Sequence, residues 1–229
     1  NNSLLFIFGL MVLIVACSKK EIITPVSKEI IHFDEYHGQK VSDPYRWLEN
    51  FTDDEVKEWV GLQNNYSQQF LKNKFQKSIK QDLELIWTSE YLSTPFKVGD
   101  KIFYYFNTGK LEQNRLMIRD CESCPERILI DPNDFSNDGT VSLASVSVSP
   151  NAEWIAFAKS DGGSDWRTWK IMNIASGEIL DDEIEWSKFS SAEWSPDSKG
   201  FFYRKYLKPD GEELLDLNSS PKLMFHSIG

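Results

Sequence analysis

The residues closest to a catalytic serine motif lie at 162–166, where the chain reads Gly-Gly-Ser-Asp-Trp. One class of hydrolases with a serine nucleophile places it on a sharp strand-to-helix turn, in a Gly-x-Ser-x-Gly context. Here Trp166 occupies the place of the second glycine, and the sequence predicts neither a strand before Ser164 nor a helix after it. We therefore interpret Ser164 as a polar residue of a turn between strands, and we predict no catalytic residue in this chain.

The chain has three histidines, His32, His37 and His226. A general base must hydrogen-bond to its nucleophile and be oriented by a third group, and no nucleophile is predicted for these side chains to serve. Their spacing also fits no metal-ligand pattern. We interpret all three as structural or exposed, and we predict no metal site and no cofactor.

Cys121 and Cys124 form a Cys-Glu-Ser-Cys sequence in a polar turn between two strand-like runs. A zinc site would need two more ligands, and a thioredoxin-like redox site would need a helix N-terminus after a strand. We favour a small local disulfide that closes the turn in an oxidising compartment. Free thiols, and metal or redox chemistry, stay open as alternatives.

The chain begins with an apolar run at residues 4–16 that is followed by Cys17. Thirteen apolar residues are too few to span a bilayer, which takes about 20. The pattern favours a bacterial signal peptide at 1–17 with a lipobox, in which Cys17 is lipidated, followed by a linker at 18–33. A buried hydrophobic helix with an incidental cysteine is the alternative. The expected location is the periplasm or outer membrane, with a lipid anchor at Cys17 as the only membrane attachment.

The composition excludes some partners and some classes of chain. With 25 basic and 35 acidic residues the formal charge is −10, and an acidic chain without a basic patch argues against nucleic acid as a partner. Aromatic residues make up 14% of the chain, including eight tryptophans. That content argues against disorder and suits a sheet-rich fold.

Two amphipathic helices are predicted before residue 90. The first spans about 53–72, where apolar residues recur every three or four positions after a capping box formed by Thr52 and Glu55. The second spans about 77–89, with Ile79, Leu83 and Ile86 on one face. Both are interpreted as packing helices.

Short alternating strands broken by turns follow Pro95, at 101–106, 115–118, 127–130 and 141–148. An internal repeat indicates their architecture, because residues 148–157 recur as 194–203, each with a Ser-Pro-Asn or Ser-Pro-Asp turn, at an interval of 46 positions. A weaker copy lies at 98–105. Such intervals are typical of β-propeller blades. The sequence therefore predicts a mainly β fold with about three blades at 91–229, which form an open arc because closed propellers have four to eight.

The octet Ser-Asp-Pro-Tyr-Arg-Trp-Leu-Glu at 42–49 resembles the N-terminal signature of the prolyl oligopeptidase family of serine peptidases. Further matches follow in order and at compatible spacing, at residues 36–38, 63–64, 104–109, 129–133, 138–141, 163–166, 188–190 and 222–226. The resemblance extends from about 34 to 229. It leaves residues 1–30 uncovered, and the Cys121–Cys124 turn departs from it.

The resemblance implies a two-domain endopeptidase that cleaves short peptides after proline, with an α/β-hydrolase domain capped by a seven-bladed propeller. Residues 34–88 would be the N-terminal helical segment of the hydrolase domain, and residues 91–229 about three of the seven blades. The family's catalytic triad would lie beyond this chain, so the fragment is expected to be inactive. The complete protein would act on short proline-containing peptides as a monomer.

The resemblance also implies two substrate-binding residues. Phe189 matches a propeller residue that lines the peptide-binding cavity, and ordinary blade core is its alternative interpretation. Asp165 matches a position facing the same cavity, where a carboxylate would attract a peptide's amino terminus, and a solvated turn is its alternative. For the whole chain, the alternative function is a non-enzymatic envelope propeller lipoprotein that acts as a binding module.

Overall fold

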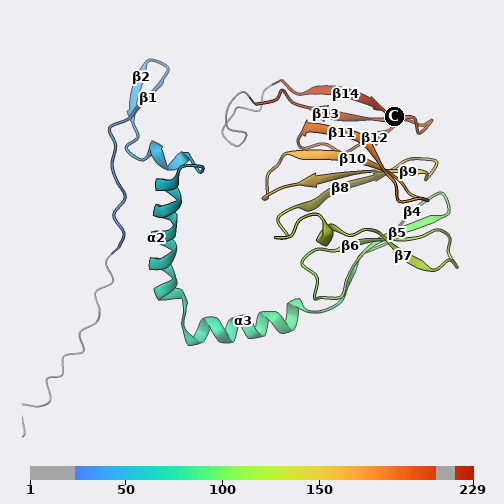
Figure 1. The fold of residues 1–229 in the computed structure, drawn as a ribbon, viewed down its shortest axis with the longest axis horizontal. Coiled ribbons are helices and arrows are strands. Elements are labelled where there is room, and N and C mark those ends of the chain that lie inside the picture. The colour runs from blue at the N-terminus through green and yellow to red at the C-terminus, as the bar shows by residue number, and fades with distance from the viewer. Residues whose placement is uncertain (1–23, 210–219) are drawn as a thin grey trace, which may run out of the picture. The chain divides into compact units, whose positions relative to one another are not determined.

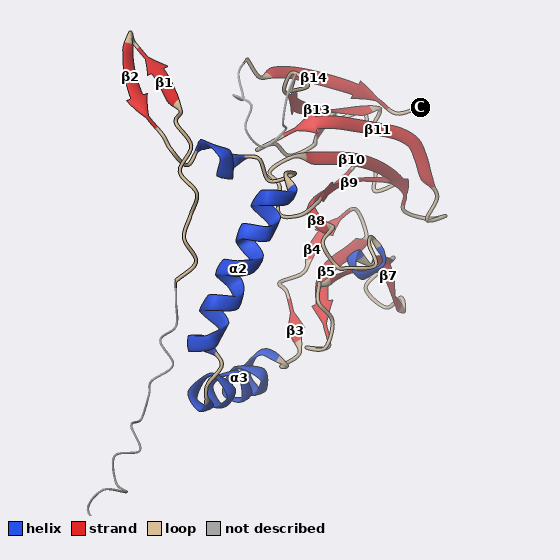
Figure 2. Cartoon of the chain, turned by 60° about the vertical axis from the view of Figure 1, so that its left-hand side comes forward, coloured by secondary structure: helices blue, strands red, loops and turns tan. Residues whose placement is uncertain are grey.

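The computed structural model describes residues 24–209 and 220–229, and its chain divides into two compact units, Asn1–Leu83 and Glu84–Gly229. The predicted signal peptide and Cys17 lie outside the described residues. Within the described part, no helix has the length and apolar character needed to cross a membrane. Figures 1 and 2 show the helices before the strand-rich part of the chain.

The first element in the described part of the first unit is a hairpin that the sequence analysis did not predict. Strand β1 (Phe33–Tyr36) pairs antiparallel with β2 (Gln39–Ser42). His37 and Gly38 connect them, both with positive φ (52° and 77°), as a two-residue hairpin turn requires. The sequence signal for these two strands is weak. Nearly every residue of the hairpin is exposed, so apolar and polar residues do not alternate along the strands.

The 42–49 octet has a structural role in this unit. It continues from β2 into the short 3₁₀ helix η1 (Arg46–Glu49). The Arg46 guanidinium forms ion pairs with Asp34 of β1, with Asp43 at 3.2 Å and with Glu49 at 2.7 Å. One arginine therefore joins the hairpin, the turn after it and η1.

Both predicted helices are present, with different ends. Helix α2 spans Asp54–Leu71, and its N-cap is Asp53, whose carboxylate accepts the Glu55 N–H at 2.7 Å. The predicted Thr52 cap is wrong, because the Thr52 hydroxyl instead donates to Asn50 Oδ1 at 2.8 Å. Helix α3 spans Lys74–Trp87 and begins earlier than predicted, because the Asn73 side chain accepts the free N–H groups of its first turn at 2.9 and 3.1 Å.

The second unit consists of antiparallel strands in successive groups. Blade 1 comprises β3 (Tyr91–Leu92), β4 (Phe96–Val98), β5 (Lys101–Asn107), β6 (Arg115–Arg119) and β7 (Glu126–Ile130). A 3₁₀ turn, η2 (Pro132–Asp134), leads to blade 2, which comprises β8 (Ser142–Val148), β9 (Trp154–Ser160), β10 (Arg167–Asn173) and β11 (Ile179–Ser187).

The remaining described strands are β12 (Glu193–Trp194), β13 (Gly200–Lys205) and β14 (Lys222–Ser227). We call these strands blade 3. Figure 1 shows them beside the strands of blade 2, with which they share one sheet through the pairing of Ser187 in β11 with Lys205 in β13. The prediction of a mainly β, incomplete propeller is confirmed.

The repeated turns have the same geometry. In the turn before β9, the Ala152 N–H bonds to the Ser149 carbonyl at 2.8 Å, and in the turn before β13 the Ser198 N–H bonds to the Ser195 carbonyl at 2.9 Å. Ala152 and Ser198 both have positive φ, 55° and 59°. The Asn151 N–H also donates to Ser198 Oγ at 3.1 Å, so the turns of neighbouring blades are hydrogen-bonded to each other.

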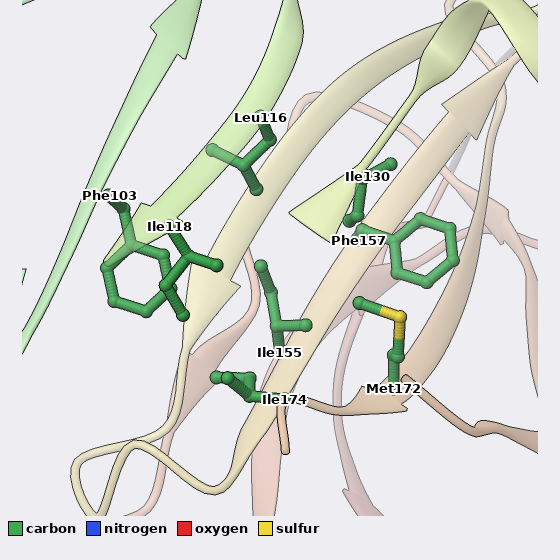
Figure 3. Packing of buried hydrophobic residues seen from close by; sticks show 8 residues of the cluster. All are labelled: Phe103, Leu116, Ile118, Ile130, Ile155, Phe157, Met172 and Ile174. Atoms are coloured by element: carbon green, nitrogen blue, oxygen red, sulfur yellow. The ribbon is translucent and has the colours of Figure 1, made fainter. Parts of the chain in front are cut away.

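Blade 2 buries both of its faces. Side chains alternate along a strand, so Ile155 and Phe157 of β9 belong to a buried cluster with blade 1 residues such as Phe103 and Ile118 (Figure 3). Ala156 and Ala158, which alternate with them along β9, belong to a second buried cluster. Its other members include Trp169, Ile171, Ile184, Phe201 and Tyr203. Small residues on that face leave room for the large rings of β10 and blade 3.

A polar network links blade 1 to blade 2. Asp120, at the end of β6, accepts from Lys101 Nζ at 2.8 Å and from Arg127 Nε at 3.3 Å. Arg127 also donates to the Ile174 carbonyl of blade 2 at 2.7 Å. The Lys101 hydrogen bond and then the Arg127 hydrogen bond and charge hold the pKa of Asp120 below its ordinary value of 3.8.

Replacing Asp120 with asparagine should make the protein modestly less stable at neutral pH. Because the folded pKa is depressed, the stabilisation is present above pH 3.8 and is lost as the pH falls through the folded pKa. The side chain is 41% exposed, so solvent screening limits the effect to less than about 1 kcal/mol. Melting temperatures of Asp120→Asn and the parent should differ at pH 7 and converge in acid. A constant difference at every pH would contradict this account.

Candidate functional site

The Ser164 turn connects two strands of one blade. It joins β9 to β10, and Gly162 and Gly163 supply its positive φ angles of 56° and 74°. Ser164 N–H bonds to the Asp161 carbonyl at 2.9 Å, and Ser164 Oγ accepts the Trp166 N–H at 3.1 Å. The structure therefore places Ser164 in a polar strand-to-strand turn, as predicted, where its hydroxyl stabilises the turn. The expectation that no strand precedes Ser164 is wrong, because β9 ends at Ser160.

Two of the histidines contact carboxylates. His32 Nε2 lies 3.2 Å from Asp34 Oδ1, and His226 Nε2 of β14 lies 2.5 Å from Asp182 Oδ1 of β11. The second pair joins blade 3 to blade 2. Sequence reasoning missed it because the two residues are 44 positions apart and no local pattern connects them.

Cys121 and Cys124 are joined by a disulfide in the turn between β6 and β7, with their Cα atoms 4.9 Å apart. The Cys124 N–H also bonds to the Cys121 carbonyl at 3.1 Å. In the described part of the chain, no group of three or more histidine, cysteine, aspartate or glutamate side chains is arranged to hold a metal ion.

Asp165 and Phe189 lie at the same end of neighbouring strands. Strand β10 pairs with β11 through Arg167 and Ser187; Asp165 precedes the first by two residues and Phe189 follows the second by two. Both side chains are exposed, Phe189 to 57%. Arg167 Nη1 also donates to the Ser190 carbonyl at 2.8 Å, which ties the two segments together. The structure thus brings the two predicted residues to the same end of β10 and β11 in blade 2.

Phe189 is not part of the blade core, so that alternative interpretation is wrong. Its φ is 49°, a conformation that is uncommon for a bulky residue and that clusters at functional sites. An exposed ring held in this way can offer a flat apolar surface to a ligand side chain. The φ value was not foreseeable from the sequence, because no glycine or asparagine marks the position.

A pocket of about 700 Å³ lies nearby, between strands of blade 2 and the segment that follows blade 1. Its lining includes Lys159 and Phe135, whose ring centroid lies 4.1 Å from Lys159 Nζ. Burial, and then the neighbouring charge of Lys170, lower the pKa of Lys159. Neither Asp165 nor Phe189 lines this pocket. The candidate site is therefore the exposed end of β10 and β11 that carries these two residues. The pocket adjoins it, because Ser164 and Trp166, on either side of Asp165, line the pocket.

Comparisons with known proteins agree with this architecture. Residues 25–229 match the family model described as the prolyl oligopeptidase N-terminal beta-propeller domain. The chain is 38% identical over 207 residues to the prolyl endopeptidases of Elizabethkingia miricola and Elizabethkingia meningoseptica, and these matches cover 90% of the chain.

Solved structures give the same result. A prolyl endopeptidase structure matches 90% of the chain with a TM-score of 0.81 at 31% identity, and the match covers 31% of that protein. Prolyl oligopeptidase B of Galerina marginata, bound to a 35-residue hydrolysis and macrocyclization substrate, matches 91% of the chain with a TM-score of 0.75 at 26% identity, and 32% of that protein is covered. The chain spans about 29% of the length of the Elizabethkingia relatives. Because the family model matches residues 25–229, this chain belongs to the prolyl oligopeptidase family and carries its N-terminal propeller region.

Proposed function

We propose that this chain is the N-terminal part of a serine-type endopeptidase that cleaves short peptides after proline. The observation that carries the proposal is the continuous match of residues 25–229 to the family, together with 38% identity to two prolyl endopeptidases. The nucleophile, base and acid would come from residues outside the printed sequence. The part present here would shield the reaction site and contribute to binding the peptide.

Phe189 and Asp165 are the proposed peptide contacts. The exposed Phe189 ring would bury an apolar side chain of the peptide. Asp165 is exposed at the same end of these strands as Phe189, and its carboxylate would attract a free peptide amino terminus. Asp165 would then favour a peptide with a free amino terminus over the same peptide after acetylation.

The test is to express the complete reading frame beside residues 18–229 and to assay both on a short peptide with one internal proline. We expect the complete protein to cleave after proline and to react with a serine-directed fluorophosphonate. The shorter chain should do neither, because it has no nucleophile elbow. A peptide with glycine in place of proline is the matched control.

Each result has a distinct meaning. Turnover by residues 18–229 would overturn the assignment of catalysis to residues outside the sequence. A complete protein that neither cleaves the peptide nor reacts with the fluorophosphonate would instead support the binding-module function. Equal cleavage of the free and acetylated peptides would remove Asp165 from the proposed contacts and leave the peptidase function intact.

A further inference from the structure

The segment that carries Phe189 is strained at two bulky residues. Trp186 has φ of 62° and Phe189 has φ of 49°. A non-glycine residue in this region is strained and persists only where its surroundings impose it. The contacts around residues 186–190 must therefore hold this backbone in place.

Hydrogen bonds restrain the backbone on both sides of Phe189. The Trp186 carbonyl accepts the Tyr206 N–H at 2.8 Å, and the buried Ser187 hydroxyl accepts Trp169 Nε1–H at 3.2 Å. On the other side, Ser190 accepts through its carbonyl from Arg167 and through its hydroxyl from the Arg204 N–H at 2.9 Å. These bonds hold the ends of the segment and leave Lys188 and Phe189 between them.

Lys188 is buried although it is a lysine. It is 5% exposed, and its Nζ lies 3.7 Å from the centroid of the Trp166 ring. Trp166 in turn makes edge contacts with Trp186 at 5.4 Å and with Tyr206 at 6.1 Å. Buried lysines are rare unless they are paired. Among residues 24–209 and 220–229, no carboxylate forms an ion pair with Lys188, and its ammonium group instead contacts the Trp166 ring.

Burial of Lys188 and exposure of Phe189 are linked. The two residues are adjacent, and one side chain is directed into the aromatic cluster while the other is 57% exposed. The stabilisation from a desolvated cation–π contact is of the same order as the cost of one strained residue. Loss of this contact would release the backbone conformation that presents Phe189.

We propose that Lys188 and Trp166 are positioning residues that hold Phe189 in its exposed, strained conformation and thereby set the affinity for peptide. This inference rests on the proposed function, in which Phe189 contacts the substrate. Lys188 itself does not need to touch the peptide. Its effect on binding passes through the backbone of residues 186–190.

The kinetic test is a double-mutant cycle in the complete protein with a proline-containing peptide. Lys188→Met keeps the length of the side chain and removes its charge, and it should raise KM about fivefold with kcat within about twofold. Phe189→Ala should raise KM at least as much. The double variant should be no worse than Phe189→Ala, since Lys188 acts through that ring.

Two further variants show whether the charge on the ring matters. Lys188→Arg retains a cation over Trp166 and should restore KM to within about twofold of the parent. Lys159→Met removes a lysine that lies over a different aromatic ring, that of Phe135, and should leave KM unchanged. Additive losses in the cycle, an unchanged KM in Lys188→Met, or an equal effect of Lys159→Met would overturn the proposal.

Amide hydrogen exchange separates this inference from the proposed function. Peptides that cover residues 186–191 should exchange faster in Lys188→Met than in the parent, while those from β9 should be unchanged. The measurement does not need activity, so it applies even if the complete protein cleaves no peptide. Identical exchange in the two proteins would show that Lys188 does not position Phe189, whatever the substrate.

Discussion

Replacing Trp169 with alanine should lower the free energy of unfolding of the propeller unit by about 4 kcal/mol. Trp169 is fully buried, lies opposite Ala158 in the sheet register and packs against Phe201 of blade 3 with ring centroids 6.2 Å apart. The residues around Trp169 cannot fill the cavity that the substitution leaves, because the neighbouring strand β9 carries the small side chains of Ala156 and Ala158 on this face. Denaturation of the protein, followed by tryptophan fluorescence and far-ultraviolet circular dichroism, measures the loss.

Trp169→Phe is the matched control for this substitution. It keeps a ring in the cluster and removes the Nε1–H that donates to Ser187 Oγ at 3.2 Å. We expect a loss of about 1–2 kcal/mol, from the smaller volume and the unpaired hydroxyl. Similar losses for Trp169→Phe and Trp169→Ala would mean that the hydrogen bond, and not the packing between blades 2 and 3, dominates at this position.

Replacing Gly200 with alanine should cost about 3 kcal/mol and weaken the pairing of β13 with β14. An added Cβ would lie 2.1 Å from the His226 carbonyl oxygen and 2.7 Å from Phe225 Cζ. The first of these atoms belongs to the backbone of a paired strand, so β14 must shift as a whole. The expected result is lower thermal stability and faster hydrogen exchange across residues 222–227.

Gly61→Ala provides the opposite control. Gly61 lies within α2 and an added Cβ would meet no atom within 4 Å, so the substitution should raise stability by about 1 kcal/mol through helix propensity. If Gly200→Ala were as stable as the parent, β14 would have to tolerate a displacement that its six register pairs with β13 argue against.

The parts predicted well from the sequence are those in which local signals agree with the packing. The Ser-Pro-Asn and Ser-Pro-Asp turns specify both their own geometry and the strands beside them, so β9 and β13 were predictable. Helix α2 followed from its apolar spacing. Its cap did not, since Thr52 and Asp53 are both good N-caps and only the Asn50 contact of Thr52 decides between them.

The candidate site was predictable only in part. Resemblance to the family pointed to Asp165 and Phe189, but the conformation that exposes Phe189 depends on residues brought together by folding. Lys188 reads as an ordinary surface lysine in the sequence. Its burial follows from Trp166, which is 22 positions away and belongs to a turn with no recognisable aromatic motif.

The hydrogen bond between the repeated turns limits how the length of this chain can change. Asn151 and Ser198 come from equivalent turns of successive repeats, and a residue inserted in either turn would move its donor or acceptor out of reach. In the turn between β10 and β11 the bond to another blade is made by Ile174, whose carbonyl accepts from Arg127 at 2.7 Å. Further along the turn, an added Cβ on Gly177 meets no atom within 4 Å. Insertions and deletions in related genes should therefore accumulate at positions like 175–177, while the edge with the serine-proline turns keeps a constant length.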